Sequence, residues 1–367
     1  MSMNITSEKL ANGIVLRLRG QLDAASAALV DAALCEALEA VVPRVIVDMA
    51  KVDYISSAGV RSLLSAFKRV QSEDRFLELI RAQVPVRKVL TVVGLGDLLP
   101  MGEGTMQILD VLKRQNPVNE QALRNARQFL LDLFRVLGIE SDPALRAVDS
   151  IFDTCRTYAT INEIENELKN LLLTLDLGQR INANLKQRSH QIYQQVSPFV
   201  GSGSILDVGC GDGMIAQALA GDQRKIQLTD VVNYNQTQLP FALYDGLSLP
   251  FPSKSFDYCF LITVLHHCDD PLCVLREAIR VTRKRIIVNE SVYLNEVNRR
   301  FNMFFDWFYN CVLHDNVNVP FNFNSPEGWE YLFRNEGLSV AASQDIGLDQ
   351  VAVPEYHWMY VLDIPQT

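Results

Sequence analysis

A glycine-rich turn in the second half of the chain constrains the fold more than any other feature. The stretch Asp207-Val-Gly209-Cys-Gly211-Asp-Gly213 follows the apolar run Ile205–Val208 and directly precedes a helical pattern over Met214–Ala220. Glycines let the backbone turn tightly and let a ligand lie against bare main chain at a helix N-terminus. A strand, such a turn and a helix in this order predict an α/β sheet with a ligand site at the turn.

More strand patterns follow from Gly203 to the end of the chain. The candidates are Ile226–Asp230, Asp257–Ile262 and Arg285–Asn289, with Leu338–Ala342 and Trp358–Leu362 as a closing pair. Asp230 ends the strand after the glycine turn, where a carboxylate can accept both hydroxyl groups of a ribose. The turn and this acid together indicate a nucleoside-containing cofactor.

The spacing of the turn separates two kinds of cofactor. It reads GxGxG rather than the GxGxxG of dinucleotide-binding folds, and Asp207 stands two residues before the first glycine. A carboxylate at that place can hold an ammonium group, which S-adenosylmethionine has and a nicotinamide cofactor lacks. The spacing therefore favours S-adenosyl-L-methionine.

Two stretches downstream, Tyr244–Asp257 and Leu261–Pro271, complete a series of motifs. With the glycine turn, this series resembles the class I S-adenosylmethionine-dependent methyltransferases, in the small-molecule branch that includes quinone methylases, from about residue 190 to 367. The resemblance implies a Rossmann-like sheet flanked by helices. It also implies a set of cofactor-binding residues: Asp207, Gly209, Gly211 and Gly213 in the turn, Asp230 at the ribose, Asp245 with Gly246 at the adenine amino group, and the main chain at Ile262 and Thr263 beside the methionine part. The other interpretation of Asp245 is a turn residue before Gly246.

Methyl transfer from a sulfonium needs little from side chains beyond alignment of the acceptor and, for a hydroxyl or amine, removal of a proton. The candidate bases are His266, His267, Tyr309 and His314. The other interpretation of each histidine is a core residue with its hydrogen bonds satisfied.

An aromatic-rich segment lies between Asn289 and Leu338, and its residues Phe301, Phe304, Phe305 and Phe308 fall on one helical face. It is either a lid helix packed on the sheet or an apolar wall for a flat or lipid-like acceptor.

Residues 1–113 alternate strand and helix patterns and form a separate α/β domain. The strands are expected at Gly13–Arg19 (ending at Gly20), Arg44–Asp48 and Phe76–Ile80, and the helices at Ala24–Val41, Ala58–Val70 and Val84–Val93. Ser56 and Ser57 lie where a loop enters a helix, a position at which serine is a favoured N-cap.

The serine stretch, with Gly20-Gln-Leu-Asp23 before it and Val86–Pro100 after it, resembles STAS domains, the anti-sigma-factor-antagonist fold, over residues 4 to 103. The resemblance implies that Ser57 is phosphorylated by a partner kinase and that Asp23 and Asp48 line the same surface. Family members often carry Asp before this serine, whereas Ser56 stands here. A switch serine and a plain helix cap therefore both remain open.

Residues 114–190 are expected to form a helical connector between the STAS domain and a methyltransferase domain at residues 191–367. Ile161, Ile164, Leu168, Leu171 and Leu175 form a short heptad seam. The seam either packs on its own chain, which we favour, or forms the stem of a homodimer.

Composition limits the partners. Asp and Glu number 43 against 34 Lys and Arg, a formal net charge of −9, and this charge disfavours nucleic acid. The seven cysteines show no ligand spacing, so neither a disulfide frame nor a metal site is expected. No signal sequence and no apolar stretch of roughly 18 residues is present, so we expect a soluble cytoplasmic protein.

Two functions fit these motifs. The first is an enzyme that methylates a small molecule and is regulated through the STAS domain. The second is a partner-switching regulator whose methyltransferase fold only senses S-adenosylmethionine. Methylation of protein or nucleic acid is disfavoured, because Ile262-Thr-Val-Leu265 stands where an Asn-Pro-Pro-Tyr type motif would mark such acceptors.

Overall fold

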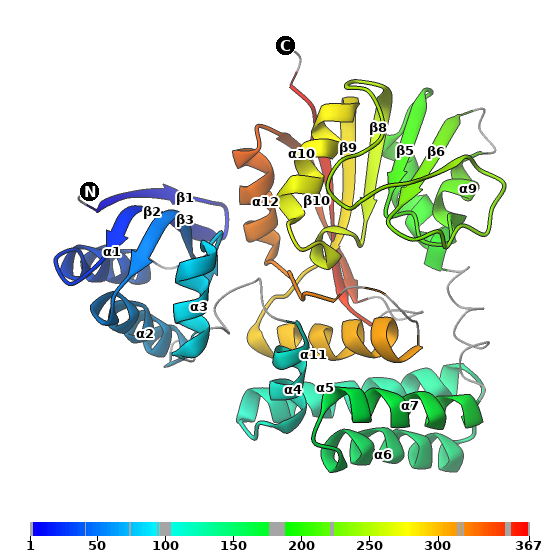
Figure 1. Ribbon diagram of the computed structural model, residues 1–367, viewed down its shortest axis with the longest axis horizontal. Coiled ribbons are helices and arrows are strands. Elements are labelled where there is room, and N and C mark those ends of the chain that lie inside the picture. The colour runs from blue at the N-terminus through cyan, green and yellow to red at the C-terminus, as the bar shows by residue number, and fades with distance from the viewer. Residues whose placement is uncertain are drawn as a thin grey trace. The chain divides into compact units, whose positions relative to one another are not determined.

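The computed structural model describes residues 3–40, 42–72, 75–93, 95, 104–175, 188–220, 224–313, 317, 319–348 and 354–365. The chain forms two compact units, residues 1–102 and 103–367 (Figure 1). The predicted α/β fold class is confirmed for both units. None of the helices in the described ranges has the length and apolar character needed to span a bilayer.

The first unit is a four-stranded sheet in the order β1-β2-β3-β4 with three helices. Its elements are β1 (Asn4–Lys9), β2 (Gly13–Leu22), α1 (Ala27–Glu39), β3 (Arg44–Ile55), α2 (Ser57–Ser72), β4 (Phe76–Ile80) and α3 (Val84–Val92). β1 runs antiparallel to β2, whereas the pairs β2–β3 and β3–β4 are parallel. The apolar faces of these strands and helices share one core.

β4 has the predicted bounds, whereas β2 and β3 are longer than the sequence predicted. β2 continues through Gly20 to Leu22, and its register against β3 shifts beside Gly20, where the backbone has φ +117°. β1 was not predicted, because its residues Asn4–Lys9 are polar and mostly exposed and so show no apolar alternation.

The second unit contains a seven-stranded sheet in the order β10-β11-β9-β8-β5-β6-β7. The strands are β5 (Ser204–Val208), β6 (Lys225–Asp230), β7 (Phe241–Leu243), β8 (Phe256–Ile262), β9 (Thr282–Ser291), β10 (Ser339–Leu348) and β11 (Tyr356–Asp363). β5 to β9 run parallel to one another, β11 pairs antiparallel with β9, and the predicted closing pair β10–β11 is present and antiparallel. Such a sheet carries ligand sites at the carboxyl ends of its parallel strands.

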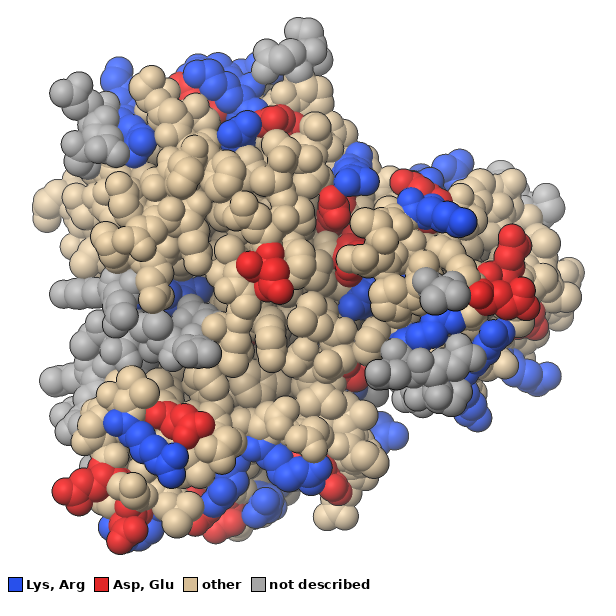
Figure 2. Space-filling view, turned by 180° about the vertical axis from the view of Figure 1, so that it is seen from behind, with Lys and Arg blue, Asp and Glu red and all other residues tan. Residues whose placement is uncertain are grey.

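Helices cover this sheet and form a further layer beside its carboxyl ends (Figure 1). The helices along the sheet are α9 (Met214–Ala220), α10 (Pro271–Val281) and α12 (Pro326–Asn335), with 3-10 turns η2 (Ser197–Phe199) and η3 (Leu265–His267). The layer contains α4 (Gly104–Lys113), α5 (Pro117–Val136), α6 (Ser141–Thr157) and α7 (Ile161–Leu175). Lys/Arg and Asp/Glu side chains are interspersed over this layer on the face shown in Figure 2.

α11 (Glu296–Trp307) lies between the helical layer and the end of the sheet and continues into the π-helical turn η4 (Phe308–Leu313) (Figure 1). Its aromatic face packs on the helical layer: the Phe305 ring lies 5.4 Å from Phe129 of α5, and Phe304 stacks on Phe152 of α6 at 5.4 Å. Both interpretations of this segment, a lid on the sheet and an acceptor wall, are therefore wrong for these phenylalanines.

The heptad seam of α7 faces the interior of the same core. Ile164 and Leu168 are fully buried, and Ile161 and Leu171 are partly buried and pack against this core. In addition, Trp307 of α11 donates a hydrogen bond from Nε1 to Glu165 Oε1 at 2.7 Å. The seam thus packs on its own chain, as we favoured.

Candidate functional site

The predicted cofactor residues meet at one point of the large sheet. From β5 the chain passes to β6 and β7 on one side and then crosses back to β8 on the other side of β5. The carboxyl ends of β5 and β8 therefore diverge into separate loops, which is where open α/β sheets bind ligands. The glycine turn follows β5, and Ile262 and Thr263 end β8.

Two glycines of the turn are required by its geometry. At Gly209, with φ +67°, a Cβ atom would lie 2.6 Å from Val264 Cγ2, so a side chain would push the β5 and β8 loops apart. At Gly211, with φ +52°, a Cβ atom would meet no heavy atom within 4 Å. The turn therefore presents bare main chain to open space.

Asp230 supports this turn from the end of β6. Its Oδ2 accepts a hydrogen bond from the Gly211 N–H at 3.0 Å, and its Oδ1 accepts one from the Val231 N–H at 2.7 Å. Burial raises the pKa of Asp230, although the backbone donors partly offset that effect. Asp230 thus holds the glycine turn in place, and it lies next to the open space that Gly211 faces.

Asp207 is a buried acid with no cationic partner among the residues that the structure describes. Burial raises its pKa to about 8, and the negative charges of Asp230 and Asp212 act in the same direction. Within the described part of the chain, no ion pair or side-chain hydrogen bond joins Asp207 to another residue. This combination creates a negative potential that a positively charged ligand would relieve.

Asp245 lies in an exposed turn after β7. Its Oδ1 accepts hydrogen bonds from the N–H groups of Leu247 and Ser248 at 2.8 and 2.7 Å, and these donors lower its pKa. Gly246 has φ +79° and lies against Val231, the residue after Asp230. Asp245 therefore closes a turn, and that turn lies beside the end of β6.

The end of β8 is held in an uncommon conformation. Thr263 has φ +56°, which costs a β-branched residue about 1–3 kcal/mol, and its N–H donates to Asn289 O at 2.6 Å. The next two N–H groups, of Val264 and Leu265, donate to Glu290 Oε1 at 2.9 and 2.6 Å. Glu290 lies fully buried on β9 and thus holds the loop after β8 in place.

The same Glu290 binds His266, whose Nδ1 lies 2.6 Å from Glu290 Oε2. Burial alone would lower the pKa of His266, but the Glu290 carboxylate outweighs it and raises the pKa to about 9. His266 is therefore protonated at neutral pH and forms a buried ion pair with Glu290.

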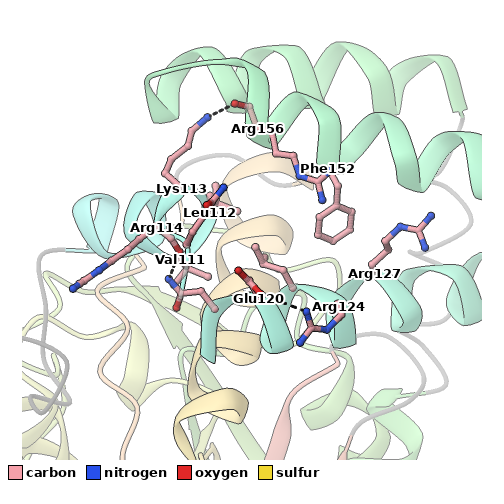
Figure 3. Close-up of a pocket in the computed structure, with 12 residues that line it drawn as sticks. Val111, Leu112, Lys113, Arg114, Glu120, Arg124, Arg127, Phe152 and Arg156 are labelled. Carbon is pink, nitrogen blue, oxygen red and sulfur yellow. Dashed lines mark hydrogen bonds and ion pairs between the residues drawn. The ribbon is translucent and has the colours of Figure 1, made fainter. Parts of the chain in front are cut away.

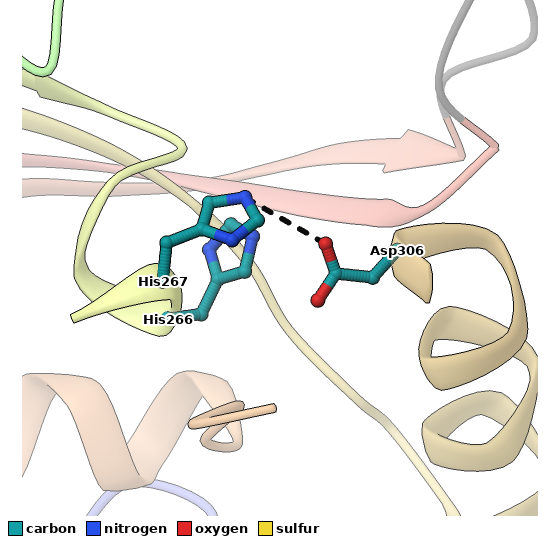
Figure 4. A group of neighbouring side chains, drawn as sticks. All are labelled: His266, His267 and Asp306. Carbon is teal, nitrogen blue, oxygen red and sulfur yellow. Dashed lines mark ion pairs between the residues drawn. The ribbon is translucent and has the colours of Figure 1, made fainter. Parts of the chain in front are cut away.

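His267 faces α11. Its Nε2 lies 3.6 Å from Asp306 Oδ1, and its ring lies 4.1 Å from the ring of His266 (Figure 4). His267 is partly exposed, whereas Asp306 is buried, and its Oδ1 also accepts a hydrogen bond from Asn310 Nδ2 at 2.7 Å. His266, His267 and Asp306 each offer a ligand atom within 4.8 Å of the others, a spacing that a metal ion can span.

The other two candidate bases are Tyr309 and His314. Tyr309 is buried in η4, where it contacts the rings of Phe305 and Phe308. His314 lies outside the described residues.

Three acids of this region, Glu290, Asp306 and Glu355, were not singled out from the sequence. Burial raises the pKa of Glu355 to about 8, and its carboxyl interacts with the Ser291 hydroxyl. Glu290 follows the apolar residues Ile286, Ile287 and Val288 in the same buried strand. Because acids are rarely buried without a partner, its position in the sequence could have marked it as a candidate site residue.

In the first unit, Ser56 and Ser57 differ in role. The Ser56 hydroxyl accepts the Gly59 N–H at 3.4 Å and caps α2, whereas Ser57 is the first residue of the helix and is exposed. Asp23 closes the turn before α1, where its Oδ1 accepts hydrogen bonds from the N–H groups of Ala25 and Ser26 at 3.0 and 2.9 Å. The expectation that Asp48 lines this surface is wrong, because Asp48 is buried and bound by Arg81.

Comparisons with known families agree with both resemblances. A model described as a STAS domain matches residues 4–106, and a model described as a methyltransferase domain matches residues 206–287. The N-terminal STAS domain and the C-terminal methyltransferase domain are thereby confirmed.

Relatives exist for each end. Over 99 residues the chain is 29% identical to the protein named "Putative anti-sigma factor antagonist BtrV" of Bordetella bronchiseptica, covering 27% of this chain and 85% of that protein. Over 93 residues it is 31% identical to the 27-O-demethylrifamycin SV methyltransferase of Amycolatopsis mediterranei, covering 22% of this chain and 34% of that enzyme. The match thus spans about a third of the length of that enzyme.

Solved structures of similar fold include SAM-dependent methyltransferases from Aquifex aeolicus and Methanosarcina mazei. Their TM-scores are 0.35 and 0.38 at 18% and 14% identity. Each covers 47% of this chain, and the matches take in 88% and 97% of those chains.

Replacing Glu290 by Gln is expected to lower the pKa of His266 from about 9, because burial is then opposed only by the weaker influence of Asp306 and Glu355. NMR titration of the histidine ring signals measures this change. In the unmodified chain the ion pair stabilises the fold fully below about pH 6.5, and this contribution is lost as the pH rises through 9. Between pH 6.5 and 9, the free energy of unfolding should therefore decrease less in E290Q than in the unmodified chain.

The control for this experiment is Glu330→Gln, which removes an acid paired only with Arg334 on α12. Its His266 titration should match that of the unmodified chain. A pKa near 9 that persists in E290Q would show that Glu290 does not hold this proton.

Proposed function

We propose that this chain, which joins an N-terminal STAS domain to a C-terminal methyltransferase domain, transfers a methyl group from S-adenosyl-L-methionine to a hydroxyl group of a small molecule. The observation that carries the proposal is the buried Asp207 carboxyl, which precedes an open glycine turn and has no cationic partner in the described ranges of the chain. The named activity of the rifamycin relative, an O-methyltransferase by its printed name, supports the same class of reaction.

The residues at the turn fit this cofactor. The bare main chain at Gly211 accommodates close approach of a ligand, and Asp230 can accept ribose hydroxyl groups at the adjacent strand end. Val231 and Leu247 are about half exposed, at 49% and 57%, which leaves apolar surface for a flat base near Asp245. Asp207 would interact with the positively charged methionine part. When bound, the cofactor supplies a methyl group made electrophilic by the sulfonium.

His267 is the residue we assign to proton removal. Asp306 faces its Nε2, which favours the tautomer that carries its proton on that nitrogen. In that tautomer Nδ1 is the basic nitrogen, and it would take the proton of an acceptor hydroxyl as the methyl group is transferred. His266, already protonated and bound to Glu290, holds the loop on which His267 stands.

The acceptor is proposed to be a small molecule. The aromatic face of α11 is filled by the helical layer, so the polar groups at His267, Asp306 and Glu355 border the acceptor space instead. An acceptor with several hydroxyl groups fits such surroundings better than the flat apolar one considered from the sequence.

The STAS domain is proposed to bind a protein partner and to carry a regulatory phosphate at Ser57. Ser56 already caps α2, so the Ser57 hydroxyl is exposed and available to a kinase. A phosphate there is compatible with the helix N-terminus but adds negative charge to the docking surface. The name of the BtrV relative, an antagonist of anti-sigma factors, points to the same kind of partner.

The alternative proposal is a regulator that binds S-adenosylmethionine without turning it over. Both proposals need Asp207 and Asp230, so binding does not separate them. Incubation with tritiated S-adenosylmethionine and a metabolite extract does: a labelled small molecule supports the enzyme, and its absence supports the sensor.

The affinity for S-adenosylmethionine is expected to rise with pH up to about 8 and then level off. A cationic ligand favours the ionised Asp207, so binding releases the proton that the free site retains below that pH. Calorimetry between pH 6 and 8.5 should show up to about tenfold tighter binding per pH unit below pH 8. D207N should bind weakly and without this dependence, whereas D132N, a change on exposed α5, should behave as the unmodified chain. Unchanged affinity in D207N would refute the cofactor assignment.

His267→Gln is expected to lower the rate of methyl transfer about 10²- to 10⁴-fold, because the acceptor hydroxyl keeps its proton. The affinity for S-adenosylmethionine should not change. Counting of labelled product from the metabolite extract measures the rate, and the exposed His190→Gln serves as the control. Full activity in H267Q would exclude His267 as the base.

Phosphate is expected on Ser57 and not on Ser56 in protein isolated from its own cells, because the Ser56 hydroxyl is used in the cap of α2. Mass spectrometry across growth conditions locates the modified residue. Absence of phosphate at Ser57 in all conditions would leave Ser57 as an ordinary first residue of the helix.

A further inference from the structure

A cavity of about 450 Å³ lies in the helical layer of the second unit. It is formed by the end of α4, the first half of α5 and the end of α6 (Figure 3). Five cations line it against one acid, Glu120, and these cations are Lys113, Arg114, Arg124, Arg127 and Arg156. The cavity is separate from the glycine turn and plays no part in the proposed methyl transfer.

The excess of cations around the cavity is not explained by the amino-acid composition of the helical layer. Residues 104–175, which contain α4 to α7, carry eight Lys and Arg but ten Asp and Glu. Of these, five of the eight cations and one of the ten acids line the cavity. Because the helical layer as a whole has an acidic surplus, this lining is a local concentration of positive charge, which favours an anionic ligand.

The cations could instead serve only to pair with acidic side chains nearby, and this explanation has to be compared with ligand binding. Arg127 forms a short ion pair with Asp149 of α6, at 2.5 Å. Arg114, Arg124 and Arg156 each contact an acid three or four residues earlier in the chain, at 3.6, 3.6 and 3.5 Å. These contacts are long, and the three arginine side chains are 63%, 61% and 72% exposed, so the pairs contribute little to stability. The guanidinium groups of these three arginines can therefore turn toward a ligand without loss of a strong interaction.

The remaining lining combines four apolar side chains with two uncharged polar ones, Gln115 and Asn119. Val111 and Leu112 of α4, Leu123 of α5 and Phe152 of α6 form the floor between the charged side chains. An inorganic anion alone would leave this apolar surface in contact with water, whereas a ligand with an apolar part would cover it. The volume lies within the range of small-molecule pockets and is too small for a folded protein segment.

We propose that this cavity binds a small phosphate monoester that carries an aromatic or aliphatic group. The planar guanidinium groups of Arg124, Arg127 and Arg156 match the geometry of a phosphate, and Lys113 adds a further positive charge. The apolar group would lie on Leu123 and Phe152. The cofactor site cannot take the same ligand, because Asp207 and Asp230 would repel its phosphate.

Titration of the full chain with phenyl phosphate tests the proposal, by calorimetry and by saturation-transfer NMR of the phenyl protons. We expect saturable binding that is at least about tenfold weaker in the double variant R124Q/R127Q, since two charge-assisted contacts are lost. Inorganic phosphate should bind more weakly than phenyl phosphate, because it makes no contact with the apolar floor.

Arg135→Gln is the matched control, since Arg135 lies on the same helix with an acid partner at 3.1 Å but outside the cavity. It should bind phenyl phosphate as the unmodified chain does. Three results would overturn the proposal: no saturable binding, equal binding by R124Q/R127Q and the unmodified chain, or loss of binding in D207N. Circular dichroism of each variant establishes that the helical layer is intact.

Discussion

The buried carboxylate of Glu290 is the constraint on which the rest of the site depends. It lies fully buried on β9, and it binds the Val264 and Leu265 N–H groups and the His266 ring at the same time. A buried charge of this kind is tolerated only when its hydrogen bonds are made, so the loop after β8 must fold around it. The strained Thr263 and the direction of His267 are consequences of that loop.

α11 contacts the helical layer on one side and the loop after β8 on the other, so it links the two. One face of the helix places Phe304 and Phe305 against α6 and α5, and the residue after Phe305 is Asp306, which faces His267. Packed cores tolerate small displacements poorly. The helices of residues 104–175 are therefore part of the support of the candidate site, and their role goes beyond connecting two domains.

Much of the sheet could be predicted from the sequence, because its parallel strands are buried on both faces and read as apolar runs. β7 and β1 could not, since β7 has three residues and β1 is polar and exposed. The cofactor turn was predictable because its function depends on residues close together in the chain. The acids opposite the histidines were not, because Glu290, Asp306 and Glu355 come from three separate elements that only the tertiary fold brings together.

The aromatic residues of α11 show that residue spacing alone does not predict which neighbour an apolar helical face packs on. Their periodicity identified an apolar helical face correctly, but periodicity does not tell which neighbour covers that face. The helical layer covers it, so these phenylalanines offer no apolar wall to the proposed acceptor. The same chain thus separates its two proposed ligands by charge: buried acids at the end of the sheet favour a cation, whereas arginines in the helical layer favour an anion. Because opposite potentials exclude each other's ligand, each site can be occupied without competition from the other.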